Sequence, residues 1–466
     1  MRIEKDTLGE VRVPEDALYG AQTQRAVENY PISGLREHPS FIRAFILLKR
    51  AAALANRELG AMDETTASAI VAACDRILSE FERFRPHFVV DVFQAGAGTS
   101  FNMNCNEVIA NLANLSLGGK PGEYKPVHPN DHVNMSQSTN DVFPTAIRIA
   151  TLMLLGVLIP RLQHLVSALD EKGAEFSDVI KSGRTHLADA VPVTLGQEFK
   201  AYAAAMRRAN RLLFDASTEL FDLGIGGTAT GTGINTPRGY RHAVIRHLNE
   251  STGLQFRAAE DLREPMQSQL PVVAVSAALR NLALELTRVA NDLRLLASGP
   301  LTGLAEINLP AVQPGSSIMP GKVNPSLIEC MNQVLFHIIG ADTAIAYASQ
   351  AGQLELNVMM PLMAFEITFS MEILKNFLPV FTDRCIRGIT ANRERSEAYY
   401  VSSPSLATAL NPIIGYAAAA EIAKESARTG KRIPDLLREK NLLPEEKIAE
   451  IFTPEFLAGQ ADRKQE

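Results

Sequence analysis

Cysteine is scarce in this sequence of 466 residues, and neither basic nor acidic residues form a block. Cys74, Cys105, Cys330 and Cys385 are scattered without C-x-x-C spacing. This excludes a disulfide framework and a zinc-binding cysteine motif, and we expect reduced thiols in a cytoplasmic protein. Acidic and basic residues are mixed along the chain, which has a net charge of −6. The pattern argues against a nucleic-acid partner and against a disordered acidic tail.

Long apolar runs are also missing. The longest, over residues 149–160, is interrupted by Gly156 and is too short to span a bilayer. Residues 1–6 are charged and contain no apolar core, so we expect no secretory signal and no membrane partner. No His, Asp or Glu cluster has the spacing of a metal site, and we expect neither a metal nor another cofactor.

The sequence is rich in apolar residues at helical spacing, from about Val142 to Asn392. We expect about five long helices there, over residues 147–169, 195–223, 275–296, 327–348 and 362–378. The clearest pattern alternates steps of four and three residues; its members are Val275, Leu279, Leu282, Leu286, Val289, Leu293 and Leu296. Leu284 and Leu295 lie off this seam, so the helix needs partners on two sides and belongs in a large bundle.

The changes in character along the chain predict three domains in a mostly α fold. Residues 1–140 mix helices with Pro- and Gly-rich turns, residues 141–392 form a central bundle, and residues 393–466 form a small C-terminal helical domain. Residues 224–229 satisfy G-x-G-x-x-A. We expect no strand before them, so we interpret them as a tight turn between helices and not as a dinucleotide site.

Four polar strings interrupt the helical pattern, each beside an expected helix start. Their residues are 96–104 (GAGTSFNMN), 136–141 (SQSTND), 183–189 (GRTHLAD) and 315–325 (GSSIMPGKVNP). Hydroxyl and amide side chains at such places usually cap helices. Together, however, they offer the donors that one small dicarboxylate needs. The glycines and prolines of the last string suit a loop that closes over an anion.

The last string resembles the signature G-S-S-x-M-P-x-K-x-N of the aspartase/fumarase superfamily, and the other three strings also match that superfamily. The resemblance extends from about Asp6 to about Gly415 and includes residues 20–23, 291–294 and 355–358. The amino acids at three places resemble those of aspartate ammonia-lyases more than those of class II fumarate hydratases. These places are residues 97–100, Thr139 and residues 351–357. The resemblance implies a three-domain fold, a homotetramer with a helical core, and active sites that combine strings from three chains.

It also implies a reaction and a role for each site residue. Aspartate would lose a proton from the carbon beside its β-carboxylate, which leaves an aci-carboxylate with two negative charges, and fixed donors would stabilise that charge. Ser316 is implied as the base, with His186 paired to Glu329. Thr99, Ser138, Thr139 and Ser317 are implied as donors to the β-carboxylate, Lys322, Asn324 and Thr185 as ligands of the α-carboxylate, and Asn140 and His186 as contacts of the amino group.

Several alternatives stay open from the sequence. The hydration of fumarate to malate is the second function, and a non-catalytic structural paralogue is the third; the intact Ser316, Lys322 and His186 argue against the latter. His128, Asn130 and Asp131 resemble a second anion site of fumarases, and a turn that caps a helix explains them equally well. Two departures from the superfamily pattern, Ala188 and Leu301, stand near a substrate string and near an expected subunit contact. Ala188 could widen the range of substrates, and activation by a divalent metal is a further open question.

Overall fold

The structure is a computed structural model that describes residues 1–459. It is built mainly of helices, as the sequence predicts, with four small two-stranded sheets. The described chain divides into two compact units. Unit 1 comprises Met1–Ile159, Arg211–Ala283 and Phe336–Lys375, and unit 2 comprises Pro160–Asn210, Leu284–Leu335 and the described residues from Asn376 onward. The division into three domains stays a prediction, and residues 460–466 of the third lie outside the described part.

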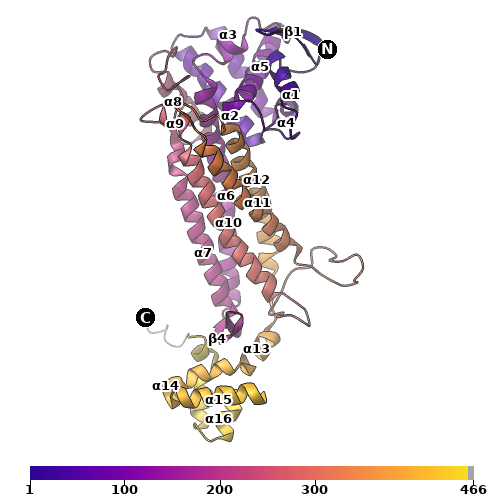
Figure 1. The fold of residues 1–466 in the computed structure, drawn as a ribbon, viewed down its shortest axis with the longest axis vertical. Coiled ribbons are helices and arrows are strands. Elements are labelled where there is room, and N and C mark those ends of the chain that lie inside the picture. Colours follow the sequence, from indigo (N-terminus) through magenta and orange to yellow (C-terminus); the bar gives the residue numbers. More distant parts are fainter. Residues whose placement is uncertain (460–466) are drawn as a thin grey trace. The chain divides into compact units, whose positions relative to one another are not determined.

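Five long helices are labelled in Figure 1, and each contributes residues to both units. They are α6 (Thr139–Glu175), α7 (Leu195–Ala216), α10 (Leu270–Leu296), α11 (Ser326–Gln350) and α12 (Met360–Arg384). These helices confirm the predicted five and their approximate positions, but the helix predicted over residues 195–223 ends at Ala216, where η4 and β5 follow. All seven members of the predicted seam of α10 are buried, whereas Leu284 and Leu295 are 50% and 41% exposed. The second apolar face of α10 is therefore uncovered in the single chain.

Unit 1 begins with a hairpin of β1 (Arg2–Asp6) and β2 (Gly9–Val13). Four phenylalanines, Phe41, Phe45, Phe101 and Phe143, form an aromatic core with ring centroids 5.0–5.9 Å apart. The further elements of this unit are α1 (Ala21–Asn29), α2 (Pro39–Glu58), α3 (Glu64–Ser79), α4 (Phe81–Phe84), η1 (Arg85–His87), η2 (Gly96–Gly98), α5 (Thr99–Ser116), η3 (Pro129–Val133), η4 (Thr218–Phe221), β5 (Asp222–Leu223), α8 (Tyr240–Thr252), β6 (Arg257–Ala258) and α9 (Glu264–Gln267).

The expectation that no strand precedes residue 224 is wrong, because β5 ends at Leu223 and pairs in parallel with β6. A strand of two residues is too short to show an alternating pattern in the sequence. The next helix, α8, begins only at Tyr240. The glycine-rich segment therefore lacks the helix start that holds a pyrophosphate in dinucleotide-binding proteins.

Unit 2 contains a hairpin of β3 (Ile180–Thr185) and β4 (Ala188–Thr194), a second small sheet of β7 (Ile307–Asn308) and β8 (Thr390–Ala391), and short C-terminal helices. These helices are η5 (Ile386–Gly388), α13 (Arg393–Ser402), η6 (Pro404–Leu410), α14 (Asn411–Ile414), α15 (Tyr416–Thr429), α16 (Ile433–Glu439), α17 (Glu445–Ile451) and α18 (Pro454–Leu457). Prolines stand in the first turns of η6, α14 and α16, where a missing N–H is tolerated. Leu406, Leu410, Ile422 and Leu436 lie in their common core.

Two helices of the described chain, α6 and α10, are long and apolar enough to cross a membrane by length and composition alone. Most of the apolar window of α6, 78%, is buried inside the protein. Core helices of bundles satisfy the same criterion. All four cysteines are free, which confirms the prediction of unpaired thiols.

Candidate active site

The first polar string forms a tight turn that starts α5. Ala97 and Gly98 have φ values of +59° and +83°, and the Ala97 N–H donates to the carbonyl oxygen of Val358 at 2.8 Å. A Cβ on Gly98 would lie 2.0 Å from the Phe143 ring, so only glycine fits this position. The turn presents Thr99 as an exposed first residue of α5, where the helix dipole favours an anion.

The second string caps α6 with a reciprocal pair of hydrogen bonds. Ser138 Oγ accepts from the Asn140 N–H at 3.2 Å, and Asp141 Oδ1 accepts from the Ser138 N–H at 2.9 Å. Asp141 Oδ2 also accepts from the backbone of Gly226 and Thr228, at 3.0 Å each. The buried Asp141, whose pKa burial raises to about 6, therefore joins the start of α6 to the glycine-rich segment.

A cavity of about 480 Å³ opens beside this cap, within unit 1. Ser138 and Thr139 line it, together with Asn102, Asn134, Ser136 and Asn235 among others. Asn140, the next residue, donates to the carbonyl oxygen of Ala229, whose residue also lines the cavity. The lining combines hydroxyls and amides with apolar side chains such as Met103 and Ile234, and it contains no carboxylate that would repel a small anion.

The third string does not start a helix, which corrects the expectation from the sequence. Its first residues end strand β3, and Thr185 pairs with Ala188 across a loop of two residues, His186 and Leu187. Both have positive φ, +56° and +59°. This is the backbone form of a tight hairpin turn, which glycine or asparagine normally adopts. The sequence therefore gives no hairpin signal here, and the backbone at the tip is held in a strained conformation.

A buried cluster of four charges lies at the base of this hairpin. Lys181 Nζ contacts Glu198 Oε1 at 2.8 Å and Glu306 Oε2 at 3.2 Å, and Arg184 contacts Glu306 Oε1 at 3.0 Å. Lys181 and Glu306 are almost completely buried. Since Arg184 directly precedes Thr185, the cluster fixes the end of the strand that carries Thr185 and leads into the turn with His186.

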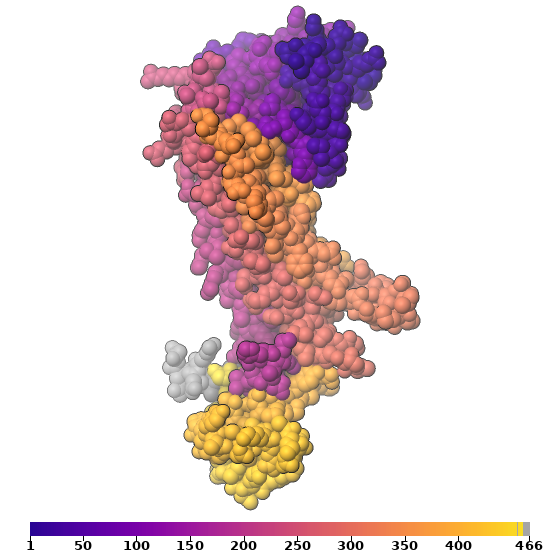
Figure 2. Space-filling view, in the orientation of Figure 1, coloured from indigo at the N-terminus to yellow at the C-terminus, as the bar shows by residue number. Residues whose placement is uncertain are grey.

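The fourth string forms a loop closed at its neck by backbone and side-chain hydrogen bonds. The Gly315 N–H donates to the carbonyl oxygen of Lys322 at 2.8 Å, and Asn324 Nδ2 donates to the Gly315 carbonyl oxygen at 2.6 Å. The loop projects from the surface of its unit (Figure 2). Ser317 and Lys322 are exposed on it, and α11 begins just beyond it at Ser326.

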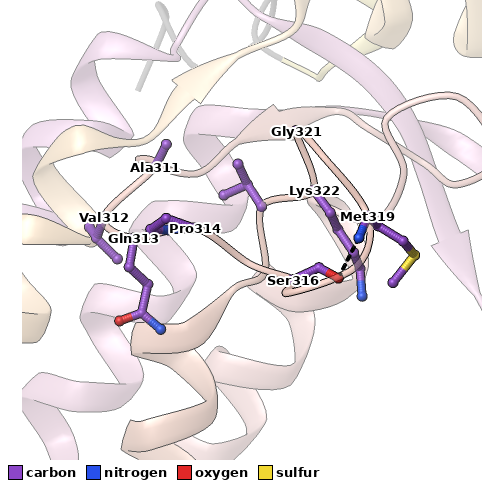
Figure 3. Close-up of a pocket in the computed structure, with 9 residues that line it drawn as sticks. Ala311, Val312, Gln313, Pro314, Ser316, Met319, Gly321 and Lys322 are labelled. Carbon is purple, nitrogen blue, oxygen red and sulfur yellow. Dashed lines mark hydrogen bonds between the residues drawn. The ribbon is translucent and has the colours of Figure 1, made fainter.

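Ser316 lies on the inner side of this loop (Figure 3). Its Oγ accepts hydrogen bonds from the N–H groups of Ile318 at 3.3 Å and Met319 at 3.0 Å. Together with Lys322 and Gln313 it lines a cavity of about 380 Å³. Two backbone donors aimed at one hydroxyl oxygen favour the negatively charged form of that oxygen.

The predicted site residues thus fall into two groups, each within one unit. Thr99, Ser138, Thr139 and Asn140 stand at the starts of α5 and α6 in unit 1, and Ser138 and Thr139 share a cavity. The remaining seven, Thr185, His186, Ser316, Ser317, Lys322, Asn324 and Glu329, lie in unit 2, where Ser316 and Lys322 share another. Within residues 1–459 no ion pair joins His186 to Glu329, so this pairing stays a prediction.

His128 caps the short helix η3. Its Nδ1 accepts from the N–H groups of Asn130 at 3.3 Å and Asp131 at 3.2 Å. The capping explanation therefore holds for this turn, and the second anion site stays a prediction. In the described part of the chain no group of three or more His, Cys, Asp or Glu side chains could hold a metal ion.

Sequence reasoning missed Lys49, Asn102 and Asn134. Asn102 and Asn134 line the cavity beside Thr139, and the buried Lys49 donates to both. A signal existed, because Lys49 stands in the apolar stretch FILLKRAAALA, where a lysine requires a polar partner. The sequence does not show which partner that is.

Comparison with known proteins identifies the family. A family model described as "Lyase" matches residues 9–340, and one described as "Fumarase C C-terminus" matches residues 406–459. A curated relative from Bacillus sp, named aspartate ammonia-lyase, is 47% identical over 466 residues and covers all of this chain and 99% of its own.

Two solved structures share the fold. The crystal structure of a fumarate lyase:delta crystallin from Brucella melitensis, bound to cobalt, has a TM-score of 0.94 and 46% identity, covering 98% of this chain and 99% of that one. A recombinant class II fumarase from Schistosoma mansoni has a TM-score of 0.93 and 35% identity, covering 99% and 100%. The chain belongs to the lyase family of the aspartase/fumarase superfamily, which confirms the predicted fold class and makes it an enzyme.

Proposed function

We propose that this enzyme is an aspartate ammonia-lyase, which converts L-aspartate reversibly into fumarate and ammonia. The similarity to aspartate ammonia-lyases runs through the whole chain. The observation that carries the chemistry is the environment of Ser316, whose Oγ receives two backbone N–H donors at the neck of an exposed loop. A serine hydroxyl is a poor base unless its oxyanion is stabilised, and these donors supply that stabilisation.

In the proposed mechanism Ser316 Oγ, as the oxyanion, takes the proton from the carbon beside the β-carboxylate. The electron pair moves into that carboxylate and forms the aci-carboxylate with two negative charges. Thr99, Ser138, Thr139 and Ser317 donate hydrogen bonds to it, and one such donor is worth roughly 3 kcal/mol of barrier. The pair then returns to form the double bond, the C–N bond breaks, and ammonia leaves with the bonding electrons.

The other predicted residues hold the substrate in place. Lys322, Asn324 and Thr185 bind the α-carboxylate, while Asn140 and His186 contact the amino group. Glu329, in the first turn of α11, pairs with His186 of another subunit. Because the loop residues Ser317 and Lys322 are exposed, closure of the loop over the substrate would exclude water and strengthen each of these contacts.

We further propose a cytoplasmic homotetramer with active sites shared between chains. Large apolar side chains are exposed along the long helices, including Phe214 (56%), Leu284 (50%), Phe336 (56%) and Tyr347 (67%). Copies of the same helices on partner subunits would cover them. No additional protein partner is needed to explain this surface.

The second candidate function is the hydration of fumarate to L-malate, supported by the structural similarity to a class II fumarase. The experiment follows fumarate by its ultraviolet absorbance, with L-aspartate and with L-malate, for the wild type and for Ser316→Ala. We expect fumarate from aspartate only, and its loss in the variant. Fumarate from malate alone would replace the ammonia-lyase by a hydratase, and an inactive wild type would favour a non-catalytic paralogue.

A further inference from the structure

Lys49, on α2, is a lysine with no exposed surface. Its Nζ donates to Asn102 Oδ1 at 2.7 Å and to Asn134 Oδ1 at 3.0 Å, and within the described chain no carboxylate pairs with it. Burial lowers the pKa of Lys49 to about 7. The charge of Asp141 acts on it without a direct ion pair, and its Nζ lies 5.7 Å from the centroid of the Phe45 ring. Burial of a lysine without a directly paired carboxylate is costly for the fold. Its position directly behind the cavity of unit 1 suggests what it does there.

The direction of the hydrogen bonds follows from the chemistry of lysine. Lysine has three donors as an ammonium group and two as a neutral amine, so in either form Lys49 can donate to both amide oxygens, and the side-chain oxygens of Asn102 and Asn134 face it. The planar amide of Asn102 then directs Nδ2 the other way, where it donates to Thr139 Oγ1 at 3.1 Å. Thr139 accepts this bond, and its own hydrogen must go elsewhere.

Within residues 1–459 the Thr139 hydroxyl donates to no protein acceptor, and Thr139 lines the cavity next to Ser138. The hydrogen-bond order from Lys49 through Asn102 leaves that O–H free to donate to an anion in the cavity. If position 49 held an acceptor, the Asn102 amide could rotate and present its oxygen to Thr139. The Thr139 hydroxyl would then donate to Asn102 and not to an anion in the cavity.

We propose that Lys49 is a positioning residue for the proposed reaction: acting through Asn102, it fixes the Thr139 hydroxyl as a donor to the substrate carboxylate. The inference rests on the proposed function only in taking that carboxylate as the occupant of the cavity. Asn134 supports the arrangement, because its Oδ1 accepts from Lys49, from Asn102 Nδ2 at 3.3 Å and from Asn106 Nδ2 at 3.2 Å.

The first test is Asn102→Asp, which reverses the direction of the hydrogen bond between residue 102 and Thr139 with almost no change in the shape of the side chain. One carboxylate oxygen keeps Lys49 as its partner, and the other can only accept, so the Thr139 hydroxyl must donate to it. We expect kcat for aspartate to fall about tenfold or more, with thermal unfolding close to that of the wild type. Thr139→Ala alone should lower kcat about a hundredfold, as removal of one donor to a developing oxyanion does.

The decisive measurement is the double variant. If Lys49 acts through Thr139, adding Lys49→Met to Thr139→Ala should lower kcat less than about threefold further. Asn102→Asp is not used for this cycle, because Asn102 lines the cavity and a carboxylate there repels an anion whether or not Thr139 is present. The same cycle with Asn102→Ala in place of Lys49→Met tests the coupling if the methionine variant does not fold. Lys172→Met is the control: Lys172 is another buried lysine, which donates to the Ile389 carbonyl oxygen, and its loss should affect stability and not kcat.

Effects of Lys49→Met and Thr139→Ala that multiply independently would overturn the positioning role of Lys49, as would unchanged kinetics of Lys49→Met. These results are distinguishable from a failure of the proposed function. A wild type that forms no fumarate from aspartate overturns the ammonia-lyase, whereas an active wild type with independent effects overturns only the role of Lys49.

Discussion

Gly98, in the first polar string, has to be glycine for two reasons, its backbone conformation and the closeness of the Phe143 ring. Its φ of +83° is strained for any residue with a Cβ, and that Cβ would overlap the Phe143 ring at 2.0 Å. Gly118 has the same φ, but nothing lies within 4 Å of its added Cβ. The two glycines therefore separate the effect of the backbone from the effect of packing.

We predict that Gly98→Ala lowers the free energy of unfolding by about 3 kcal/mol or more, because backbone strain adds to overpacking of an aromatic core. Gly118→Ala should cost only about 1 kcal/mol, from the backbone alone. Urea denaturation of both variants measures the difference. Equal losses would show that the Phe143 ring moves away without penalty.

Glu37 is a second residue whose environment has a measurable consequence. It is fully buried near Asp91, with Gln94 Nε2 as a donor to Oε1 at 3.1 Å, and burial raises its pKa to about 8. Between its ordinary pKa of 4.5 and about 8 the folded state holds a proton that the unfolded state has lost. The stabilising protonation is complete below pH 4.5 and is lost as the pH rises through 8, so stability falls with pH in this window.

Glu37→Gln should remove this dependence. We predict that the variant and the wild type are similarly stable near pH 5, and that the variant gains an advantage on the order of a few kcal/mol by pH 8. Thermal unfolding across this pH range measures it, with the exposed Glu10→Gln as the control. An advantage that does not grow with pH would mean that Glu37 is charged in the folded protein.

Some site residues can be predicted from the sequence alone and others cannot. The serine loop and the strings around Thr99 and Thr139 are short and contiguous, so their residues stand out in the sequence. Lys49 was not, because its partners Asn102 and Asn134 stand 53 and 85 residues away in the chain. Periodicity locates a side chain on a helix face, but it does not show which distant amide that face meets.

At the scale of elements, long helices were predictable and the hairpin was not. The seam of α10 repeats over three heptads, and every member is buried. The hairpin of β3 and β4 has a bulge between Ser182 and Gly183 and a turn made of His186 and Leu187. Neither residue is typical of a tight turn, so tertiary contacts and not local propensity hold this element in place.

Glu306 supplies those contacts and can be tested alone. We predict that Glu306→Gln lowers the free energy of unfolding by about 3–5 kcal/mol, because it leaves Lys181 and Arg184 buried with one carboxylate fewer. Asp178→Asn, which breaks an exposed pair with Arg393, should change it by less than about 1 kcal/mol. Urea denaturation compares the two variants. Similar small losses would show that water replaces Glu306 at the hairpin.

At the scale of the whole molecule, the proposed assembly would cover the exposed apolar faces of the long helices and would also complete the active sites. The predicted site residues fall into two groups in two units. A site made of strings from several chains would explain why the single chain pairs His186 with no acid among its described residues. Assembly and catalysis should then be lost together.

Leu284→Asp tests this dependence. Leu284 lies on α10 off the buried seam, half exposed, so a carboxylate there does not disturb the core of the single chain. In a tetramer it would be buried without a partner, at a cost of several kcal/mol for each copy. We predict a folded protein of normal helix content by circular dichroism, a mass below that of the tetramer by light scattering, and activity lowered at least about a hundredfold.

Leu8→Asp, at an 80% exposed leucine between β1 and β2, is the control and should retain both assembly and activity. A dissociated Leu284→Asp protein with full activity would show that each chain carries a complete site, and an intact tetramer would place α10 outside the subunit interface.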